Sequence, residues 1–408
     1  MIHVTSEIKP LKKVLLHRPG KELLNLTPDT LNKLLFDDIP YLKDAQIEHD
    51  EFASILKENG IEVVYLEDLM TEVLDNNPNI KPAFIRQFIY EAGIRTPMYK
   101  DMLFDLLMNI EDNKELVLKT MEGIKVDELD RKKKDIENSL VDLVSEEGKF
   151  LAEPLPNLYF TRDPFASVGD GVVLNKMYSE TRSRETIYAS YIFNYHPEYQ
   201  DKVKKYYDRE NPFNIEGGDV LNLNEHILAI GISQRTSADA IDLLSKNLFA
   251  DSDCKIDTVL AFLIPECRAF MHLDTVFTQI DYDKFTYHPG IMDSLRVFEI
   301  TRGDRPDLVK VKQKKGSLEK ILEEYLEKDI TLIPCAGGDK IPSEREQWND
   351  GTNTLCIAPG VVVVYNRNNV TNDILRSHGL KVYEMHSAEL SRGRGGPRCM
   401  SMPLIRED

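Results

Sequence analysis

The sequence lacks the features that mark exported, membrane-spanning or zinc-binding proteins. Its five cysteines are an odd number without Cys-x-x-Cys spacing, so neither a disulfide framework nor a zinc site is indicated. No apolar run reaches the roughly 18 residues that a membrane helix needs, and the N-terminus has no apolar signal segment. These absences predict a cytoplasmic protein with no membrane association.

Positive charge and phosphate-binding motifs are also scarce. The 408 residues include 51 Lys and Arg against 69 Asp and Glu, which gives a net charge of −18. This acidic balance argues against a nucleic-acid or anionic-membrane binder, because phosphate-rich surfaces need clustered cations, and it is compatible with a cationic small substrate. The sequence contains no phosphate loop, dinucleotide glycine fingerprint or metal-spacing cluster, so we expect no cofactor and no metal.

Hydrophobic periodicity predicts an α/β protein. Residues 11–17 are expected to form one strand and residues 61–65 another. The helix expected between them, residues 47–60, places Ile47 and Phe52 near one apolar face and ends at a glycine. Strand–helix–strand alternation is the signature of an α/β architecture.

The alternation stops in the segment 71–150. Apolar residues recur three and four apart there without a strand-like run. We therefore expect an α-helical subdomain of residues 71–150, inserted into a catalytic unit of residues 1–70 and 151–408. The helices of this subdomain are expected over residues 83–93, 97–110 and 127–145.

Three later segments share an apolar strand, a polar turn and a helix start with Ser, Thr or Asn cap candidates. They begin at Gly171, His226 and Val361. An acidic or amide-bearing element precedes each strand. A similar strand expected over Met271–Phe277 and the N-terminal strand at Val14 supply two further units, and five ββαβ-like modules predict pseudo-symmetric closure around an axis.

A cysteine near the C-terminus is a candidate nucleophile. Cys399 lies in a glycine-rich segment with Arg392, Arg394 and Arg398, and an electropositive setting lowers the pKa of a thiol. A flexible basic tail with a chance cysteine is the alternative for this stretch alone.

Candidate acids and bases precede the expected strands. The period of two in a strand places His272 and Asp274 on one face, as an oriented acid–base pair or as a satisfied core pair. Glu216 and Asp219 flank a Gly-Gly pair, which permits a turn that directs Glu216 into a cavity; a surface turn is the alternative. Asp163 lies among aromatics and a proline, a pattern of a partly buried carboxylate or of an ordinary strand end.

Several carboxylates around one thiol suit a planar cation, since carboxylates bind guanidinium through paired, charge-assisted hydrogen bonds. Arg182 and Arg235, at turns after strands, are placed to hold a substrate carboxylate, although either alone could be a surface arginine. The carboxylates also oppose formation of a thiolate. We therefore expect a cationic substrate to help ionise Cys399 as it binds.

Five motifs in this order resemble the arginine deiminase family of the guanidino-group-modifying superfamily. They are Asn157-Leu-Tyr-Phe-Thr-Arg-Asp163, Glu216-Gly-Gly-Asp219, Met271-His-Leu-Asp-Thr275, Trp348-Asn-Asp-Gly-Thr-Asn353 and Arg392-Gly-Arg-Gly-Gly-Pro-Arg-Cys399-Met. The resemblance covers essentially the whole chain, including the helical insertion. It implies a five-module α/β propeller with an inserted helical bundle, which hydrolyses L-arginine to L-citrulline and ammonia.

The resemblance also implies a role for each site residue. Cys399 attacks the guanidinium carbon and forms a thiouronium-type covalent intermediate, while His272 and Glu216 move protons. Asp163 and Asp274 bind the guanidinium nitrogens. The other residues implied in substrate binding are Asn157, Phe160, Arg182, Asp219, Arg235, Gly393 and Arg394.

The implied partners are L-arginine and further copies of the chain, in a dimer or larger homo-oligomer. Segments 34–38 and 391–398 are expected to close over the substrate. One alternative is a related amidinotransferase, or a hydrolase of agmatine or methylated arginines; Arg182 and Arg235 argue against agmatine, which lacks an α-carboxylate. Another is a silent arginine-binding protein, which would need the carboxylates but not the nucleophile Cys399.

Overall fold

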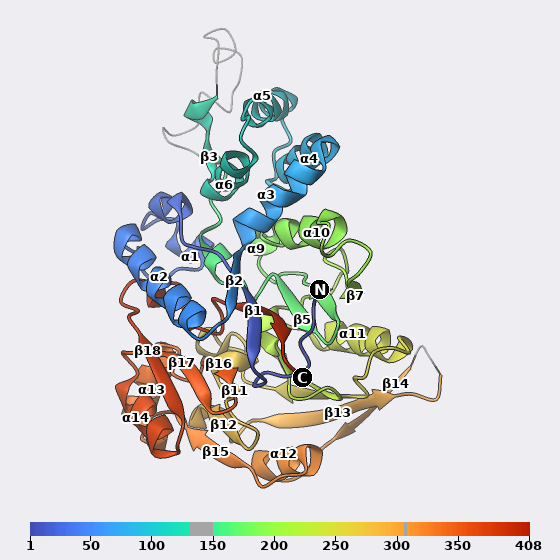
Figure 1. Ribbon diagram of the computed structural model, residues 1–408, viewed down its shortest axis with the longest axis vertical. Helices are drawn as coiled ribbons and strands as arrows, with labels where there is room; N and C mark the ends of the chain where they lie inside the picture. The colour runs from blue at the N-terminus through green and yellow to red at the C-terminus, as the bar shows by residue number, and fades with distance from the viewer. Residues whose placement is uncertain (130–149, 306–307) are drawn as a thin grey trace.

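Five of the six sheets in the described part of the chain share one repeated topology. The computed structural model describes residues 1–129, 150–305 and 308–408. In each of the five sheets one strand pairs antiparallel with a second, which pairs parallel with a third. A helix joins the two parallel strands, as a parallel pair requires. The expected five-module α/β propeller is thus confirmed (Figure 1).

Four modules are formed by the chain after residue 160. The first comprises β5 (Phe165–Val168), β6 (Gly171–Leu174), α9 (Glu180–Ser183), α10 (Thr186–Tyr195) and β7 (Lys204–Tyr207). The next comprises β8 (Val220–Asn222), β9 (Ile227–Ile232), α11 (Ala238–Ala250) and β10 (Thr258–Leu263), and its sheet is extended by β13 (Arg296–Arg302) and β14 (Val309–Gln313). The third comprises β11 (Phe277–Gln279), β12 (Lys284–Tyr287), α12 (Leu318–Leu326) and β15 (Thr331–Pro334). The fourth comprises β16 (Leu355–Ala358), β17 (Val361–Tyr365), α14 (Asn369–Ser377) and β18 (Lys381–Met385), and α13 (Lys340–Trp348) precedes it.

The fifth module joins the two ends of the chain. It comprises β1 (Leu11–Leu16), α2 (Leu42–Glu58), β2 (Glu62–Tyr65) and the C-terminal strand β19 (Met402–Arg406). β19 pairs antiparallel with β1, a contact between distant segments that no local pattern had indicated. Because β19 begins three residues after Cys399, closure of the ring also fixes the position of that cysteine.

Two local expectations from the sequence were wrong. Ile47 in α2 is 67% exposed rather than buried, although Phe52 is buried. The strand expected over Met271–Phe277 begins only at Phe277. Backbone hydrogen bonds from Thr275 to His272 and from Val276 to Leu273 bend this segment into a 3-10 turn instead.

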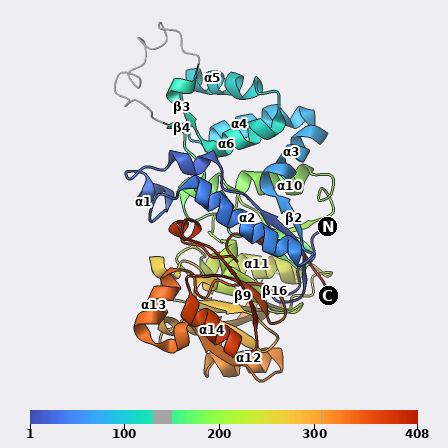
Figure 2. The same ribbon diagram turned by 60° about the vertical axis from the view of Figure 1, so that its left-hand side comes forward.

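The segment between β2 of the fifth module and β5 of the first module is mainly helical. It contains α3 (Leu66–Asn76), α4 (Lys81–Glu91), α5 (Pro97–Met108) and α6 (Asn113–Glu122), followed by the short pair β3 (Ile124–Lys125) and β4 (Phe150–Ala152). α4, α5 and α6 lie together at the top of Figures 1 and 2, apart from the propeller sheets. The helix expected over 127–145 falls largely outside the described residues, and 126–128 form a 3-10 turn.

Side-chain caps mark where two of the propeller helices begin, and a left-handed residue marks where a short helix near the N-terminus ends. Ser237 and Ser317 accept backbone N–H groups of the first turns of α11 and α12. The short helix α1 (Leu31–Leu34) ends at Leu35, whose φ of 63° turns the chain back toward the propeller. Within the described ranges, no helix has both the length and the apolar character needed to cross a bilayer.

Candidate active site

The turns that precede the first strands of the modules meet in one place. Asp163 precedes β5, Glu216 precedes β8, and His272 and Asp274 precede β11. Cys399 precedes β19 in the same way. The repeated topology therefore brings together residues that are far apart in the sequence, and all five are buried.

His272 lies between two carboxylates. Its Nε2 is 2.8 Å from Oε2 of Glu216, and its Nδ1 is 3.9 Å from Oδ1 of Asp163. Burial alone would lower the pKa of His272, but Asp163 and the hydrogen bond to Glu216 raise it to about 9. The imidazole is therefore protonated at neutral pH and can donate a proton.

Glu216 is held as a carboxylate. Burial alone would raise its pKa, but Arg235 and the hydrogen bond to His272 lower it to about 2. The backbone N–H of Tyr178 donates to Oε1 of Glu216 at 2.9 Å. An ionised glutamate beside His272 stabilises the imidazolium and fixes its orientation.

Asp163 and Asp274 have matching surroundings. Oδ2 of Asp163 accepts a hydrogen bond from Arg182 at 2.8 Å, and Oδ2 of Asp274 accepts one from Arg398 at 2.7 Å. The Oδ1 atoms of both residues are buried and have no hydrogen-bond partner among the described residues. A buried carboxylate oxygen without a donor is costly, so each aspartate is ready to accept an N–H from a bound cation.

The thiol of Cys399 lies beside Asp274, with Sγ 3.7 Å from Oδ2. Burial, together with Asp274, Asp163 and Asp350, raises the pKa of Cys399 well above its usual value, and Arg398 opposes this shift. The basic setting that the sequence indicated therefore does not lower the pKa of the thiol. Its arginines point elsewhere: Arg398 binds Asp274 and Glu7, and Arg392 pairs with Asp38 and Glu389.

The two candidate carboxylate-binding arginines differ in their contacts. The guanidinium of Arg182 is occupied by Asp163 and Glu185. Arg235 is equally buried, yet its Nε and Nη1 have no hydrogen-bond partner among the described residues, and Nη2 contacts only the sulfur of Met271 at 3.4 Å. Arg235 is therefore the more available of the two for an anionic group.

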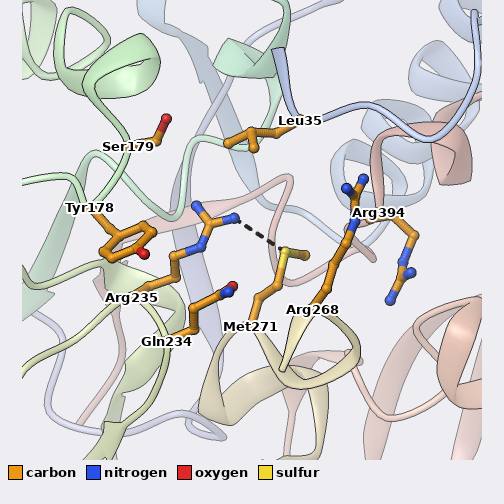
Figure 3. Close-up of a pocket in the computed structure, with 8 residues that line it drawn as sticks. All are labelled: Leu35, Tyr178, Ser179, Gln234, Arg235, Arg268, Met271 and Arg394. Carbon is orange, nitrogen blue, oxygen red and sulfur yellow. Dashed lines mark hydrogen bonds between the residues drawn. The ribbon is translucent and has the colours of Figure 1, made fainter. Parts of the chain in front are cut away.

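A cavity extends from Cys399 to the surface. Its inner part is lined by Leu35, Asn157, Phe160, Asp163, Arg182, Arg235, Met271, His272, Thr275, Gly393, Arg394 and Cys399. The outer part, shown in Figure 3, shares four of these residues and adds Tyr178, Ser179, Gln234 and Arg268. Most of the candidate site residues from the sequence thus line one cavity.

Three members of the predicted set do not line this cavity: Glu216, Asp274 and Asp219. The oxygens of Asp219 are both used within the fold. Ser233 and the backbone N–H of Leu273 donate to its two oxygens at 2.7 and 2.8 Å. Burial raises the pKa of Asp219 to about 6, partly offset by His272 and these hydrogen bonds. Asp219 therefore supports the turn that carries His272 rather than facing a ligand.

The two expected covering segments lie against each other at the mouth of the cavity. Asp37 accepts hydrogen bonds from Arg268 and, at 3.3 Å, from Arg394. Arg394 also stacks on Trp348, 3.5 Å from the ring centroid. A Cβ on Gly393 would lie 1.9 Å from the hydroxyl of Tyr159, so this loop position requires glycine.

Several lining residues were not identified from the sequence. Leu35 lies in a predicted covering segment and Met271 in one of the five motifs, but neither had a role of its own, and Arg268 comes from a turn without a chemical signature. The φ of 63° at Leu35 can be seen only in the folded backbone. Met271 directly precedes His272, and that neighbourhood was the one signal by which it could have been found.

Asp163, Glu216 and His272 offer ligand atoms within 4.8 Å of one another, which is close enough to hold a metal ion. Arg182 already pairs with Asp163, and Nη1 of Arg235 is 3.8 Å from Glu216. A metal cation here would meet two guanidinium groups and a protonated imidazole. These charges fit an organic cation, whose N–H groups need acceptors, better than a metal.

Comparison with known proteins connects this geometry to a family. The family described as arginine deiminase matches residues 32–406. The chain belongs to the arginine deiminase family. An arginine deiminase from Treponema denticola is 62% identical over 100% of this chain and 99% of its own length. Those from Clostridium perfringens and Streptococcus agalactiae are 53% and 55% identical over 100% of this chain and 98% of their own lengths.

Solved structures share the fold at low sequence identity. SxtG, an amidinotransferase from Microseira wollei, matches with a TM-score of 0.57 and 14% identity over 100% of this chain and 98% of its own. The N-terminal domain of the cyanobacterial arginine dihydrolase ArgZ matches with a TM-score of 0.53 and 14% identity over 97% of this chain and 98% of its own. The propeller of this arginine deiminase family member is therefore shared with other arginine-processing and amidino-transferring enzymes.

Proposed function

We propose that the protein hydrolyses L-arginine to L-citrulline and ammonia through a covalent intermediate on Cys399. The observation that carries this proposal is the pair of buried Oδ1 atoms of Asp163 and Asp274, which have no hydrogen-bond partner among the described residues. Asp163 lines the same cavity as Cys399, and the carboxylate of Asp274 lies beside its thiol. A guanidinium is planar, and its N–H groups can donate to two carboxylates at once. Bound between the two aspartates, it presents its central carbon to Sγ.

The first half of the reaction forms a C–S bond. Positive charge from the bound guanidinium offsets the carboxylates that hold the thiol pKa high, so Cys399 loses its proton as the substrate binds. Sγ attacks the guanidinium carbon, and His272, protonated because its pKa is about 9, donates a proton to the departing nitrogen. The C–N bond to the departing nitrogen breaks, ammonia leaves, and the guanidinium carbon remains bound to Cys399 as a thiouronium that still carries the rest of the arginine.

The second half reverses these roles. His272, now neutral, takes a proton from a water molecule that attacks the same carbon. The C–S bond breaks and releases L-citrulline, which regenerates the thiolate and the imidazolium. The second proton of the water goes to solvent, where the ammonia released in the first half is protonated to ammonium. The proton that Cys399 gave up to solvent on substrate binding returns to it when the product leaves. Glu216 stays ionised throughout because its pKa is about 2, and it stabilises the imidazolium.

The far end of the substrate is assigned to Arg235, with Asn157, Arg182 and Arg394 nearby on the same cavity wall. A buried guanidinium with two nitrogens that lack a hydrogen-bond partner among the described residues favours a ligand that carries a carboxylate. This supports arginine over agmatine as the substrate. Phe160 lines the cavity where the aliphatic stem would lie, and Gly393 allows the loop to approach it.

A direct assay tests the proposal. Purified protein incubated with L-arginine is expected to release citrulline and ammonia in equal amounts. The Cys399→Ser variant is expected to bind L-arginine in calorimetry without turnover, because it keeps both aspartates. Binding without turnover by the unaltered protein would instead support a silent arginine-binding protein.

Three further expectations belong to the same proposal. Residues 1–70 and 151–408 are proposed to carry the site, since every residue that lines the cavity lies within them, and the described helices between residues 71 and 129 support the proposed insertion of 71–150. The five cysteines are unpaired, which supports a location in the reducing cytoplasm. The chain is expected to assemble as a homo-oligomer, which light scattering would measure.

A further inference from the structure

The segment Trp348–Asn353 is rich in polar residues and lies next to the site, yet no step of the proposed reaction uses it. Its last residue, Asn353, is completely buried and precedes β16. It occupies the position in its module that Asp163, Glu216 and Asp274 occupy in theirs. Asn353 is not among the residues that line the cavity, and both groups of its side-chain amide are used within the fold.

The side-chain amide of Asn353 links the nucleophile to a guanidinium-binding residue. Its Oδ1 accepts the backbone N–H of Cys399 at 3.1 Å, and its Nδ2 donates to the backbone carbonyl of Asp274 at 3.1 Å. An N–H needs an acceptor and a carbonyl needs a donor, so only one orientation of the amide satisfies both. An aspartate could replace the first contact but not the second.

The backbone around Asn353 is itself fixed to the segment that carries Asp274. The hydroxyl of Thr352 donates to the carbonyl of Thr275, and the carbonyl of Thr352 accepts the hydroxyl of Thr278 at 2.6 Å. The N–H of Asn353 donates to the carbonyl of Asp350 at 3.0 Å. Asn353 is therefore a rigid part of the wall against which the C-terminal loop is placed.

The C-terminal loop packs directly on this wall. A Cβ on Gly396 would lie 2.7 Å from the backbone oxygen of Asn353 and 2.8 Å from its Oδ1. Both distances are shorter than a van der Waals contact, so a side chain at this position would push the loop away. Glycine at 396 is what allows the backbone of Cys399 to reach the amide of Asn353.

We infer that Asn353 is a positioning residue that sets the distance between the nucleophile and the bound guanidinium. It fixes Cys399 relative to Asp274, whose carboxylate holds the substrate, and the resulting separation of Sγ from Oδ2 is 3.7 Å. The inference rests on the proposed hydrolysis of arginine, in which both residues touch the reacting group. Loss of the link should impair the chemical step and leave substrate binding intact.

Asn353→Ala and Gly396→Ala break the same contact from opposite sides. We expect each to lower kcat on the order of 100-fold with KM nearly unchanged, because a displacement of about 1 Å at the reacting atoms can cost this much. Asn353→Asp keeps the acceptor for the Cys399 N–H but adds a carboxylate near the thiol. It should move the pH midpoint of Cys399 alkylation upward, because a negative charge next to the thiol opposes its ionisation.

Asn372→Ala is the matched control. Asn372 is as buried as Asn353, and its Nδ2 donates to the backbone carbonyl of Tyr365 at 3.0 Å, away from the cavity. Its kcat should change little. If kcat of Asn353→Ala and Gly396→Ala falls no further than that of the control, or if KM rises while kcat is retained, the inference is overturned.

Gly396→Ala leaves the interior of the wall unchanged, so it tests the inference even if substitution of Asn353 prevents folding. Citrulline formation by the unaltered protein in the same assay tests the proposed function separately. Active unaltered protein with unaffected variants contradicts the positioning role alone.

Discussion

Replacement of Arg235 by alanine should weaken binding of L-arginine and leave binding of agmatine unchanged. The guanidinium of Arg235 is buried, and its Nε and Nη1 lack partners among the described residues, so a substrate carboxylate would gain its hydrogen bonds at little cost. A hydrogen bond to a charged group contributes roughly 1.5 to 3 kcal/mol. The dissociation constant for L-arginine should therefore rise by about 10- to 150-fold.

Calorimetry in a Cys399→Ser background gives both dissociation constants without turnover. Agmatine has the same guanidinium but no α-carboxylate, so it isolates the contribution of Arg235. Arg268→Ala is the matched control, because Arg268 lies on the outer wall of the same cavity and pairs with Asp37. It should leave the ratio of the two dissociation constants unchanged.

The binding experiment should be run at a pH well above the pKa of Glu216, so that this residue stays ionised in the proteins with and without Arg235. Arg235 is the charge that most strongly lowers the pKa of Glu216, so its removal raises that pKa. The acid side of the activity profile of Arg235→Ala should therefore move to higher pH. Equal weakening of arginine and agmatine binding would refute the assignment of Arg235 to the carboxylate.

Two other predictions concern titration. A non-reactive guanidinium compound should lower the pH midpoint of Cys399 alkylation, since burial and nearby carboxylates hold the thiol pKa high and a bound cation offsets them; an unchanged midpoint would contradict substrate-assisted ionisation. Glu7 is buried against Arg398, and although burial raises its pKa, the arginines lower it from 4.5 to about 2. Because the pKa of Glu7 is lower in the folded state, its carboxylate stabilises the fold at pH values above the unfolded-state pKa of 4.5, and this stabilisation is lost as the pH falls toward about 2. Glu7→Gln should therefore lower the free energy of unfolding, measured in urea, by up to about 3 kcal/mol near neutral pH and by less near pH 3. An equal cost at both pH values would contradict this account.

The repeated strand and helix patterns were visible in the sequence because apolar periodicity is a local property. The segments at Gly171, His226 and Val361 each begin or immediately precede a strand of the propeller. The pairing of β19 with β1 was not visible, because it joins residues about 390 positions apart and no local pattern marks the two strands as partners. Closure of the ring is therefore a property of the folded chain.

The sequence indicated which chemical groups form the candidate site, but it did not indicate their protonation states or their hydrogen-bond partners. Cys399 has three arginines within seven residues, which indicated a lowered pKa, yet only Arg398 acts on the thiol, and nearby carboxylates outweigh it. Whether an arginine lowers the pKa of the thiol depends on where its side chain points, and distance along the sequence does not reveal that direction. In the same way Asp219 belongs to a site motif, but its oxygens are used within the fold.

The most direct test of the account is to detect the covalent intermediate on Cys399. The protein is mixed with L-arginine, quenched in acid within a turnover, digested and analysed by peptide mass spectrometry. The account predicts that the peptide containing Cys399 gains the mass of arginine less one ammonia, and that Cys399→Ser shows no adduct and forms no citrulline. Citrulline formation by the Cys399→Ser variant at the rate of the unaltered protein would contradict the central claim.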